Sequence, residues 1–255
     1  MEHMVKIPTL RELLNVGAHF GHTRGRRHPK AKSFIFTTKN SINIINLELT
    51  QSLLKEALEY VKKLGSEGKT ILFVGTKRQT KSLLTERCQK AGVPYVAERW
   101  IGGLLTNFEV IRKSVEMYIE LEKQREESEF QNLNKVMQAK MEHKLLRLRT
   151  NFGGIKELTK LPDALFILDL ASEKTAVREA RKMDIPIIAL VDTNADPTLA
   201  QYPIPSNDDA GKVLELMLNL ILEAYEEGKE LAEKIAVSKE EEDKKSVSKK
   251  GTKDE

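Results

Sequence analysis

The sequence predicts a three-layer α/β fold, a parallel sheet with helices on both faces, plus a protruding antiparallel helical hairpin. Short apolar runs typical of buried parallel strands occur at 70–75, 164–170 and 185–192. Helical patterns separate the strands, which implies right-handed crossovers. One long stretch, 106–150, contains no strand pattern and interrupts this alternation. The arrangement is typical of flavodoxin-like and Rossmann-like folds.

The chain begins with a short helix and a pair of strands. Pro8 and Thr9 precede leucines at helical spacing, which predicts a capped helix that ends at Gly17. Residues 33–37 and 42–47 are rich in β-branched and aromatic side chains, so two strands are expected there. The polar residues between them form the predicted turn.

Helices and strands then alternate. Amphipathic spacing predicts a helix over 50–68, with Gly65 and Gly68 marking its exit. A helix is predicted over 76–92, after the first core strand, and a second core strand follows at 93–98.

The second half of the chain completes the sheet. A helix is predicted over 172–184, between the last two core strands, and a Pro-rich loop follows Asp192. A final helix is expected over 208–228. The charged, Ser-rich segment 228–255 cannot bury enough apolar surface to offset its chain entropy, so it is predicted to be disordered.

The strand-free stretch has its own apolar pattern. Two stripes at helical spacing predict a coiled-coil hairpin of two helices, each roughly 30 Å long if it has about 20 residues. The stripes are Val110, Ile111, Val115, Tyr118 and Leu121, and then Leu133, Met137, Met141, Leu145 and Leu148. Residues 1–105 and 151–227 are thus expected to form one α/β domain, with 106–150 as an insertion.

Composition excludes several classes of protein. The chain has 255 residues, 40% of them hydrophobic, which suffices for a good-sized core. No run of about eighteen apolar residues exists, so no membrane span is expected. The N-terminus lacks the apolar block of a secretory signal. The single cysteine, Cys88, cannot form an internal disulfide and is predicted to be a reduced, partly buried helical thiol.

Positive charge is concentrated in the first part of the chain. The net charge is +4, but residues 1–99 hold 18 Lys and Arg against 8 Asp and Glu. No acid occurs between Glu12 and Glu48, where six cations lie: Arg24, Arg26, Arg27, Lys30, Lys32 and Lys39. A long acid-free basic stretch containing Gly, Pro and aromatic residues predicts a polyanion as partner.

Ligand sites of other kinds are weakly supported. Gly75 and Lys77 follow a strand, but the pattern lacks the glycines of a P-loop or a dinucleotide fingerprint. The acids Asp169, Asp192, Asp196, Asp208 and Asp209 resemble a magnesium site, although helix caps and turns explain them better. His19, His22 and His28 lack zinc-like spacing, and an ion near His19, His22 and Asp192 stays open. No cofactor is predicted.

Several long strings resemble one known family. "LLNVGAHFGH", "ILFVGTKRQT", "RWIGGLLTNF" and "IPIIALVDTNADP" are similar to the bacterial-type family of small-subunit ribosomal protein number two, over residues 5 to about 228. The resemblance implies a structural, non-enzymatic role: binding to 16S-type ribosomal RNA, subunit assembly and recruitment of ribosomal protein number one. It implies a ribosome in the cytoplasm, or in an organelle stroma or matrix. No membrane contact and no homo-oligomer are expected.

The residues predicted to bind RNA fall into two patches and one aromatic site. They are Arg24, Arg26, Arg27, His28, Lys30 and Lys32, then Lys77, Arg78 and Lys81, and finally Arg99 and Trp100. Trp100 has two open interpretations, stacking on RNA or packing in the core. Arg27 and His28 stand where the family has an aromatic residue and Asn, which favours electrostatic contacts over stacking in this loop.

Two rival functions remain. A phosphate-handling α/β enzyme would use Lys77, Asp192 and Asp208, but no set of nucleophile, base and orienting group can be assembled. An adaptor that binds only protein through the helical hairpin would leave the basic stretch without a role.

Overall fold

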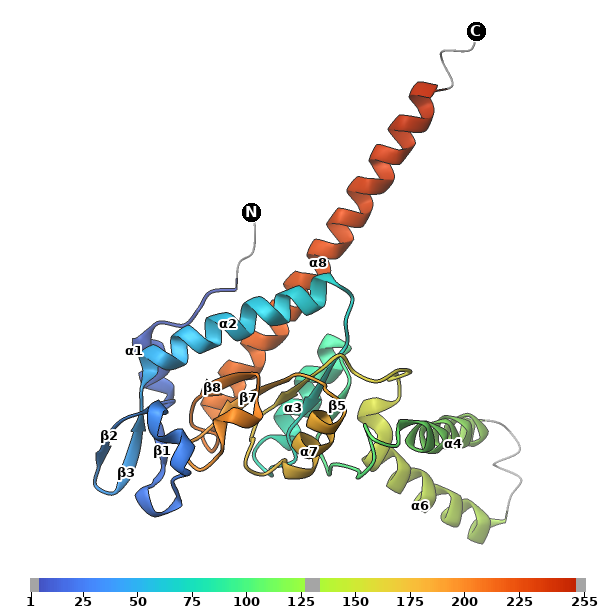
Figure 1. Ribbon diagram of the computed structural model, residues 1–255. Coiled ribbons are helices and arrows are strands. Elements are labelled where there is room, and N and C mark those ends of the chain that lie inside the picture. Colours follow the sequence, from blue (N-terminus) through green and yellow to red (C-terminus); the bar gives the residue numbers. More distant parts are fainter. Residues whose placement is uncertain (1–4, 127–133, 251–255) are drawn as a thin grey trace.

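A computed structural model describes residues 5–126 and 134–250 (Figure 1). Its centre is a five-stranded sheet in the order β5-β4-β6-β7-β8, in which all neighbours are parallel. The strands are β4 (Ile71–Val74), β5 (Tyr95–Val96), β6 (Ala164–Ile167), β7 (Ile187–Val191) and β8 (Tyr202–Pro205). The predicted parallel sheet is therefore confirmed.

Helices cover both faces of this sheet. Along β4, Ile71 and Phe73 belong to one core cluster and Leu72 and Val74 to another, because successive side chains of a strand point to opposite faces. The first cluster contains side chains of α1 (Leu10–Val16), α2 (Leu47–Ser66), α3 (Lys81–Ala91) and α8 (Gly211–Lys250). The second contains side chains of α7 (Lys174–Lys182). The three-layer α/β prediction is confirmed.

The N-terminal helix is fixed by its caps. The hydroxyl of Thr9 accepts a hydrogen bond from the backbone N–H of Glu12, whose carboxylate accepts one from the N–H of Thr9 at 2.7 Å. Gly17 ends the helix with φ of 86°. The predicted capped helix is confirmed.

A small antiparallel sheet packs beside the main one. Its order is β1-β3-β2, with β1 (Phe20–Thr23), β2 (Ile35–Lys39) and β3 (Ile42–Ile45). The β2–β3 pair confirms the predicted strands with shifted ends, because the turn is only Asn40 and Ser41, both at positive φ. The first strand, β1, was not predicted.

Strand β8 was also missed, since its segment was predicted to be a loop. Pro203 and Pro205 lie within it. Proline cannot donate to a strand ladder, but β8 is the edge strand and has only one neighbour, β7. An edge position thus tolerates a sequence that would not suit a central strand.

One predicted helix exit is wrong. Gly65 lies inside α2, where a Cβ atom would collide with backbone of α8. Gly68, with φ of 65°, is the residue that turns the chain. Gly65 therefore serves close helix packing rather than chain reversal.

Helices α4 (Phe108–Glu126) and α6 (Lys135–Phe152) pack together and extend away from the sheet (Figure 1). Val115, Tyr118 and Leu145 are buried, as their stripes predict. Val110 and Met137 are more than half exposed, at 52% and 56%. The predicted turn between the helices lies outside the described residues, as does Leu133, so the coiled-coil hairpin stays a prediction.

The C-terminal helix is longer than predicted. Helix α8 continues to Lys250, through most of the segment for which the sequence predicts disorder. Backbone hydrogen bonds of a helix are local and need no core, and Glu and Lys, which are frequent in this segment, favour the helical state.

Candidate nucleic-acid interface

The N-terminal basic segment, residues 21–39, consists of the small sheet's first two strands and two 3-10 turns, η1 (Arg24–Arg26) and η2 (Pro29–Phe34). It lies at the opposite end of the molecule from α4 and α6 (Figure 1). Five of its cations are exposed: Arg24, Arg26, Lys30, Lys32 and Lys39. Arg27 and His28 are partly buried.

Buried contacts hold this basic segment against the end of β7. The backbone N–H of His28 donates to the carbonyl of Thr193 at 2.8 Å. The N–H of His22 donates to Asp192 Oδ1 at 3.1 Å and to Thr193 Oγ1 at 2.9 Å, and Phe34 is buried. The cations therefore sit on an ordered scaffold, which reduces the entropy lost when they bind a partner.

Most exposed cations of the basic segment are free. Within the described ranges of the chain, Arg24, Arg26, Lys32 and Lys39 form no ion pair. Lys30 differs, because its Nζ lies 2.7 Å from the carboxylate of Asp196. Burial opposes ionisation of Asp196, but hydrogen bonds from Lys30 and Thr198 lower its pKa to about 2. Lys30 thus ties the segment to the body and is only partly available to phosphate.

Lys77, which the sequence predicts to contact RNA, is surrounded by carboxyl groups. Its Nζ lies 3.1 Å from Asp169, 3.1 Å from Asp208 and 2.6 Å from Asp209. Burial alone would lower the pKa of Lys77, but the carboxylates outweigh burial and raise it. Because carboxyl groups surround this ammonium group and the ionised ones would repel a phosphate, the geometry favours a structural role for Lys77 over the predicted RNA contact.

These carboxylates gather because parallel strands present their carboxyl ends at one edge. Asp208 is 1% exposed, and its Oδ2 has no hydrogen-bond partner in the described part of the protein. Burial, with Asp169 and Asp192 nearby, raises its pKa to about 7. The edge brings Lys77 and Asp208 together, as the enzyme alternative required, but their charges balance one another.

His22 belongs to this acidic edge rather than to an RNA-facing surface. Its Nδ1 lies 3.0 Å from Asp192 Oδ2, and a hydrogen bond with Asp192 raises its pKa despite partial burial. Ligand atoms of His22, Asp208 and Asp209 lie within 4.8 Å of one another, so these residues could hold a cation. Lys77 competes for the same two aspartates.

Outside the basic segment, one cation of the second predicted patch and one of the predicted aromatic site stay free. Arg78 and Arg99 are exposed and form no ion pair with any described residue. Lys81 lies 2.6 Å from the carboxylate of Glu98. The predicted helix over 76–92 begins only at Lys81, so Arg78 lies in the loop before α3.

Trp100 packs in the core, which is one of the two interpretations that the sequence left open. It is 7% exposed, and its indole N–H donates to Glu179 Oε1 at 3.1 Å. Glu179 also accepts backbone N–H bonds from Gly103, Leu105 and Thr106, at 2.8, 3.1 and 3.3 Å. This buried carboxylate organises the loop before α4, and its sequence context, a charged position on an amphipathic helix, gave no sign of that role.

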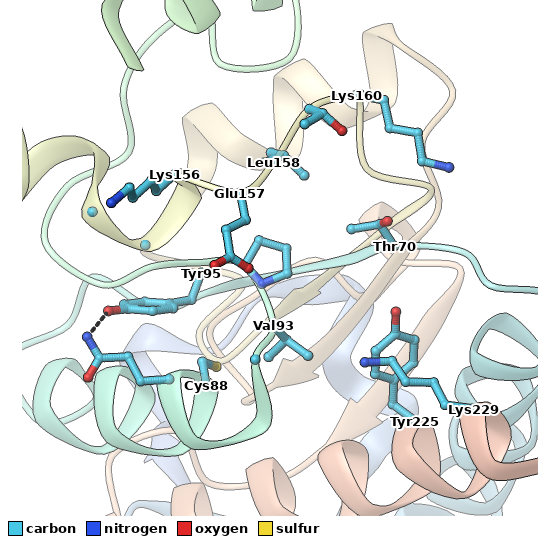
Figure 2. A pocket seen from close by; sticks show the side chains of 16 residues that line it. Thr70, Cys88, Val93, Tyr95, Lys156, Glu157, Leu158, Lys160, Tyr225 and Lys229 are labelled. Atoms are coloured by element: carbon cyan, nitrogen blue, oxygen red, sulfur yellow. Dashed lines mark hydrogen bonds between the residues drawn. The ribbon is translucent and has the colours of Figure 1, made fainter. Parts of the chain in front are cut away.

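A cavity of about 400 Å³ lies at the opposite edge of the sheet (Figure 2). None of the predicted RNA-binding residues lines it. Cys88 in its wall is buried, and burial raises its pKa to about 12, so the thiol stays protonated. The predicted helical position of this thiol is confirmed, but Cys88 is fully rather than partly buried.

Comparison with known proteins decides the family. A sequence model of the family described as "Ribosomal protein S2" matches residues 13–228. The chain belongs to the ribosomal protein S2 family. The match covers the sheet, the basic segment and helices α4 and α6, so the predicted resemblance is confirmed.

Individual members of the ribosomal protein S2 family are similar over most of their length. "Small ribosomal subunit protein uS2" of Coprothermobacter proteolyticus is 44% identical over 88% of this chain and 84% of its own. The protein of the same name from Chloroflexus aurantiacus is 44% identical over 88% of this chain and 94% of its own. That from Koribacter versatilis is 43% identical over 90% and 76%.

Membership of the ribosomal protein S2 family implies a structural, non-enzymatic role in the small ribosomal subunit. Ribonucleoprotein assembly and translation are therefore the setting in which the site should be interpreted. None of the helices that the structure describes is long and apolar enough to cross a membrane.

Proposed function

We propose that this chain binds 16S-type ribosomal RNA through its basic segment and so supports assembly of the small subunit. The observation that carries the proposal is the set of exposed, unpaired cations Arg24, Arg26, Lys32 and Lys39 on an anchored loop. Such cations displace counterions from RNA phosphates and position the protein, while RNA shape supplies specificity. Arginine also grips phosphate through two parallel hydrogen bonds.

The other predicted residues contribute unequally to this proposed contact. Arg27 and His28 border the exposed cations, while Arg78 and Arg99 are exposed cations outside the basic segment. Lys30 and Lys81 can reach phosphate only by sharing or breaking their ion pairs. Lys77 and Trp100 are not part of the proposed interface.

Salt dependence of RNA binding tests the basic segment. Arg24→Gln, Arg26→Gln and Lys32→Gln are combined, and binding to small-subunit ribosomal RNA is measured over a range of salt. The log–log slope should fall by roughly 2 to 3, about 0.7 to 0.9 for each lost phosphate contact. A control with the same charge change, Lys55→Gln, Lys63→Gln and Lys234→Gln, removes lysines that pair with glutamates and should leave the slope unchanged. An unchanged slope in the first variant refutes the proposal.

We further propose that the small sheet helps to recruit ribosomal protein number one. The family resemblance suggests this partner, and three apolar side chains are open to solvent: Phe20 at 48%, Phe36 at 75% and Ile42 at 37% exposure. An irregularity in the register between Ile35 and Thr37 lies at Phe36, and such bulges redirect side chains. Exposed apolar patches mark protein contacts.

Phe36→Ser separates this contact from RNA binding. The variant should reduce the amount of protein number one that is retained on purified subunits, while its salt-dependent RNA binding stays normal. The control is Met183→Ser, at the C-terminal end of α7, which removes an exposed apolar side chain outside the small sheet. Equal retention by both variants contradicts the recruitment proposal.

The proposed setting is the cytoplasmic ribosome, without membrane contact and without a homo-oligomer. The relatives named above are bacterial, which favours the cytoplasm over an organelle.

A further inference from the structure

The cavity of about 400 Å³, here called the amino-edge cavity, lies where β4 and β5 begin (Figure 2). Its walls come from α3, from α8 and from the segment 153–160 that follows α6. Volumes of about 300 to 1,000 Å³ are typical of small-molecule sites. Open parallel sheets usually bind ligands at their carboxyl edge, so the residues of this cavity, and not the fold class, must indicate its ligand.

Contacts within the protein hold the walls of the amino-edge cavity in place. Tyr225 is buried, and its hydroxyl donates to the carbonyl of Lys69 at 2.6 Å. The hydroxyl of Tyr95 accepts a hydrogen bond from the side-chain amide of Gln89 at 2.9 Å. A Cβ atom at Gly154 would collide with the carbonyl of Tyr95, so glycine is needed for this close approach to β5. A cavity with fixed walls loses little conformational entropy when a ligand enters.

One end of the amino-edge cavity carries two available ammonium groups. Within the described part of the chain, Lys229 forms no ion pair, and its Nζ lies 4.4 Å from the ring centroid of Tyr225. Lys160 is exposed, and its Nζ is 3.9 Å from the carboxylate of Asp163, which also accepts a hydrogen bond from the backbone N–H of Thr70. The two lysines and the hydroxyl of Thr70 are suitable donors for a phosphate group.

The other end of the amino-edge cavity offers an aromatic ring and a free carboxylate. Figure 2 shows Tyr95 and Glu157 there, away from Lys160 and Lys229. Glu157 is exposed and forms no ion pair with any described residue. Leu158, which is buried, adds apolar surface to the lining. A planar heterocycle could pack against the ring of Tyr95 and donate N–H groups to the carboxylate of Glu157.

A structural role explains the third lysine of the lining but not the other charged groups. The Nζ of Lys156 lies 2.5 Å from the carboxylate of Glu122 on α4, and this ion pair lowers the pKa of Glu122. The guanidinium of Arg112 donates to the carbonyl of Lys156 at 3.2 Å. These contacts attach the segment 153–160 to α4. Neither Lys229 nor Glu157 has a comparable ion pair among the described residues.

We propose that the amino-edge cavity binds a nucleoside phosphate. The phosphate contacts Lys160 and Lys229, and the base lies against Tyr95 and donates to Glu157. Guanine is preferred to adenine, because its ring N–H and its amino group present two adjacent donors to one carboxylate. An apolar ligand would leave these charges without a partner. The basic segment is attached to the opposite edge of the sheet, so this inference does not depend on RNA binding.

Calorimetric titration of the full-length chain with GMP tests the phosphate end. Wild type should bind GMP at millimolar concentration or below. Combining Lys160→Gln with Lys229→Gln should weaken binding by about tenfold or more, because charge-assisted contacts to the phosphate are lost. The control combines Lys55→Gln with Lys63→Gln, which removes the same charge from α2 outside the cavity and should keep the wild-type affinity. Circular dichroism should show equal helix content in all three proteins.

Titrations with AMP and ribose 5-phosphate test the base end. Wild type should bind GMP more tightly than AMP, and ribose 5-phosphate, which lacks a base, should bind more weakly than both. Glu157→Gln should reduce the preference for GMP over AMP, a change that a purely structural rim residue would not produce. Absence of GMP binding, equal binding of GMP and ribose 5-phosphate, or equal affinities of the lysine variant and its control would overturn the inference.

Discussion

At the scale of single residues, buried carboxylates organise this protein more than its exposed cations do. Glu179 accepts hydrogen bonds from the indole of Trp100 and from the loop that leads into α4. Burial opposes its ionisation, but these donors lower its pKa. Asp208 shows the opposite balance, since burial and neighbouring carboxylates raise its pKa to about 7. Hydrogen-bond donors thus stabilise the ionised form of Glu179, whereas the ionised form of Asp208 has too few donors to offset its burial.

Glu179→Ala should destabilise the protein by about 3 kcal/mol. The substitution leaves the N–H groups of Trp100, Gly103 and Leu105 without their acceptor, and unsatisfied buried donors cost about 1 to 3 kcal/mol each when water cannot reach them. Urea denaturation measures the loss. Glu179→Gln keeps one acceptor oxygen and should lose less, so equal denaturation midpoints for wild type and both variants would contradict this role.

Asp208 should make stability fall as pH rises. Its pKa is raised from 3.8 to about 7, so the folded state binds its proton more tightly than the unfolded chain does. This contribution to the free energy of unfolding is complete below about pH 4 and is lost between pH 4 and pH 7. Urea denaturation across this range should show wild type losing stability relative to Asp208→Asn.

Exposed Asp184→Asn is the control for the pH experiment. It removes the same charge at a residue outside the acidic edge, and its stability should track that of wild type across the range. A wild-type curve parallel to that of Asp208→Asn would mean that Asp208 titrates normally.

At the scale of elements, helices α2 and α8 approach each other through paired glycines. A Cβ atom at Gly228 would collide with the carbonyl of Lys62 and lie 2.9 Å from the Cα of Gly65. Gly65 of α2 lies against the backbone of α8 near Gly228, and Gly228 lies against the backbone of α2 near Gly65. The close approach of α8 to α2 therefore depends on Gly65 and Gly228, although glycine lowers helix propensity.

Gly228→Ala should destabilise the protein, although alanine favours a helix by up to about 1 kcal/mol. Overpacking against backbone costs about 1 to 3 kcal/mol and should outweigh that gain. Thermal denaturation measures the sign. Gly211→Ala, at an open position in the same helix, should be neutral or stabilising, and the same result at Gly228 would show that the helices are not tightly packed.

At the scale of the whole molecule, the basic segment lies beside the carboxyl edge of the sheet, to which His22 and Lys30 join it through Asp192 and Asp196. Most carboxylates of that edge are buried around Lys77 and His22, whereas the free cations of the segment are exposed. The acidic edge is largely neutralised internally, so it does not oppose an approaching polyanion as strongly as its residue count suggests. We therefore expect binding to depend on the exposed cations of the basic segment.

Sedimentation of cell lysate tests this distribution. The chain should migrate with small ribosomal subunits at low salt and dissociate as salt rises, because phosphate contacts weaken with ionic strength. The basic-segment substitutions should shift dissociation to lower salt than the charge-matched control at Lys55, Lys63 and Lys234 does. A chain that remains soluble and free of subunits at low salt would contradict the ribosomal assignment.

The sequence by itself determined the α/β class, the N-terminal capped helix and the exposed basic segment, because these depend on local signals: strand-length apolar runs, caps and charge density. Tertiary structure decided which charged and aromatic residues are available. Lys77 meets Asp208 from 131 positions away, and Trp100 meets Glu179 from 79 positions away. Contacts between such distant residues depend on strand order and on how helices cover the sheet. The spacing of residues along the sequence determines neither of these.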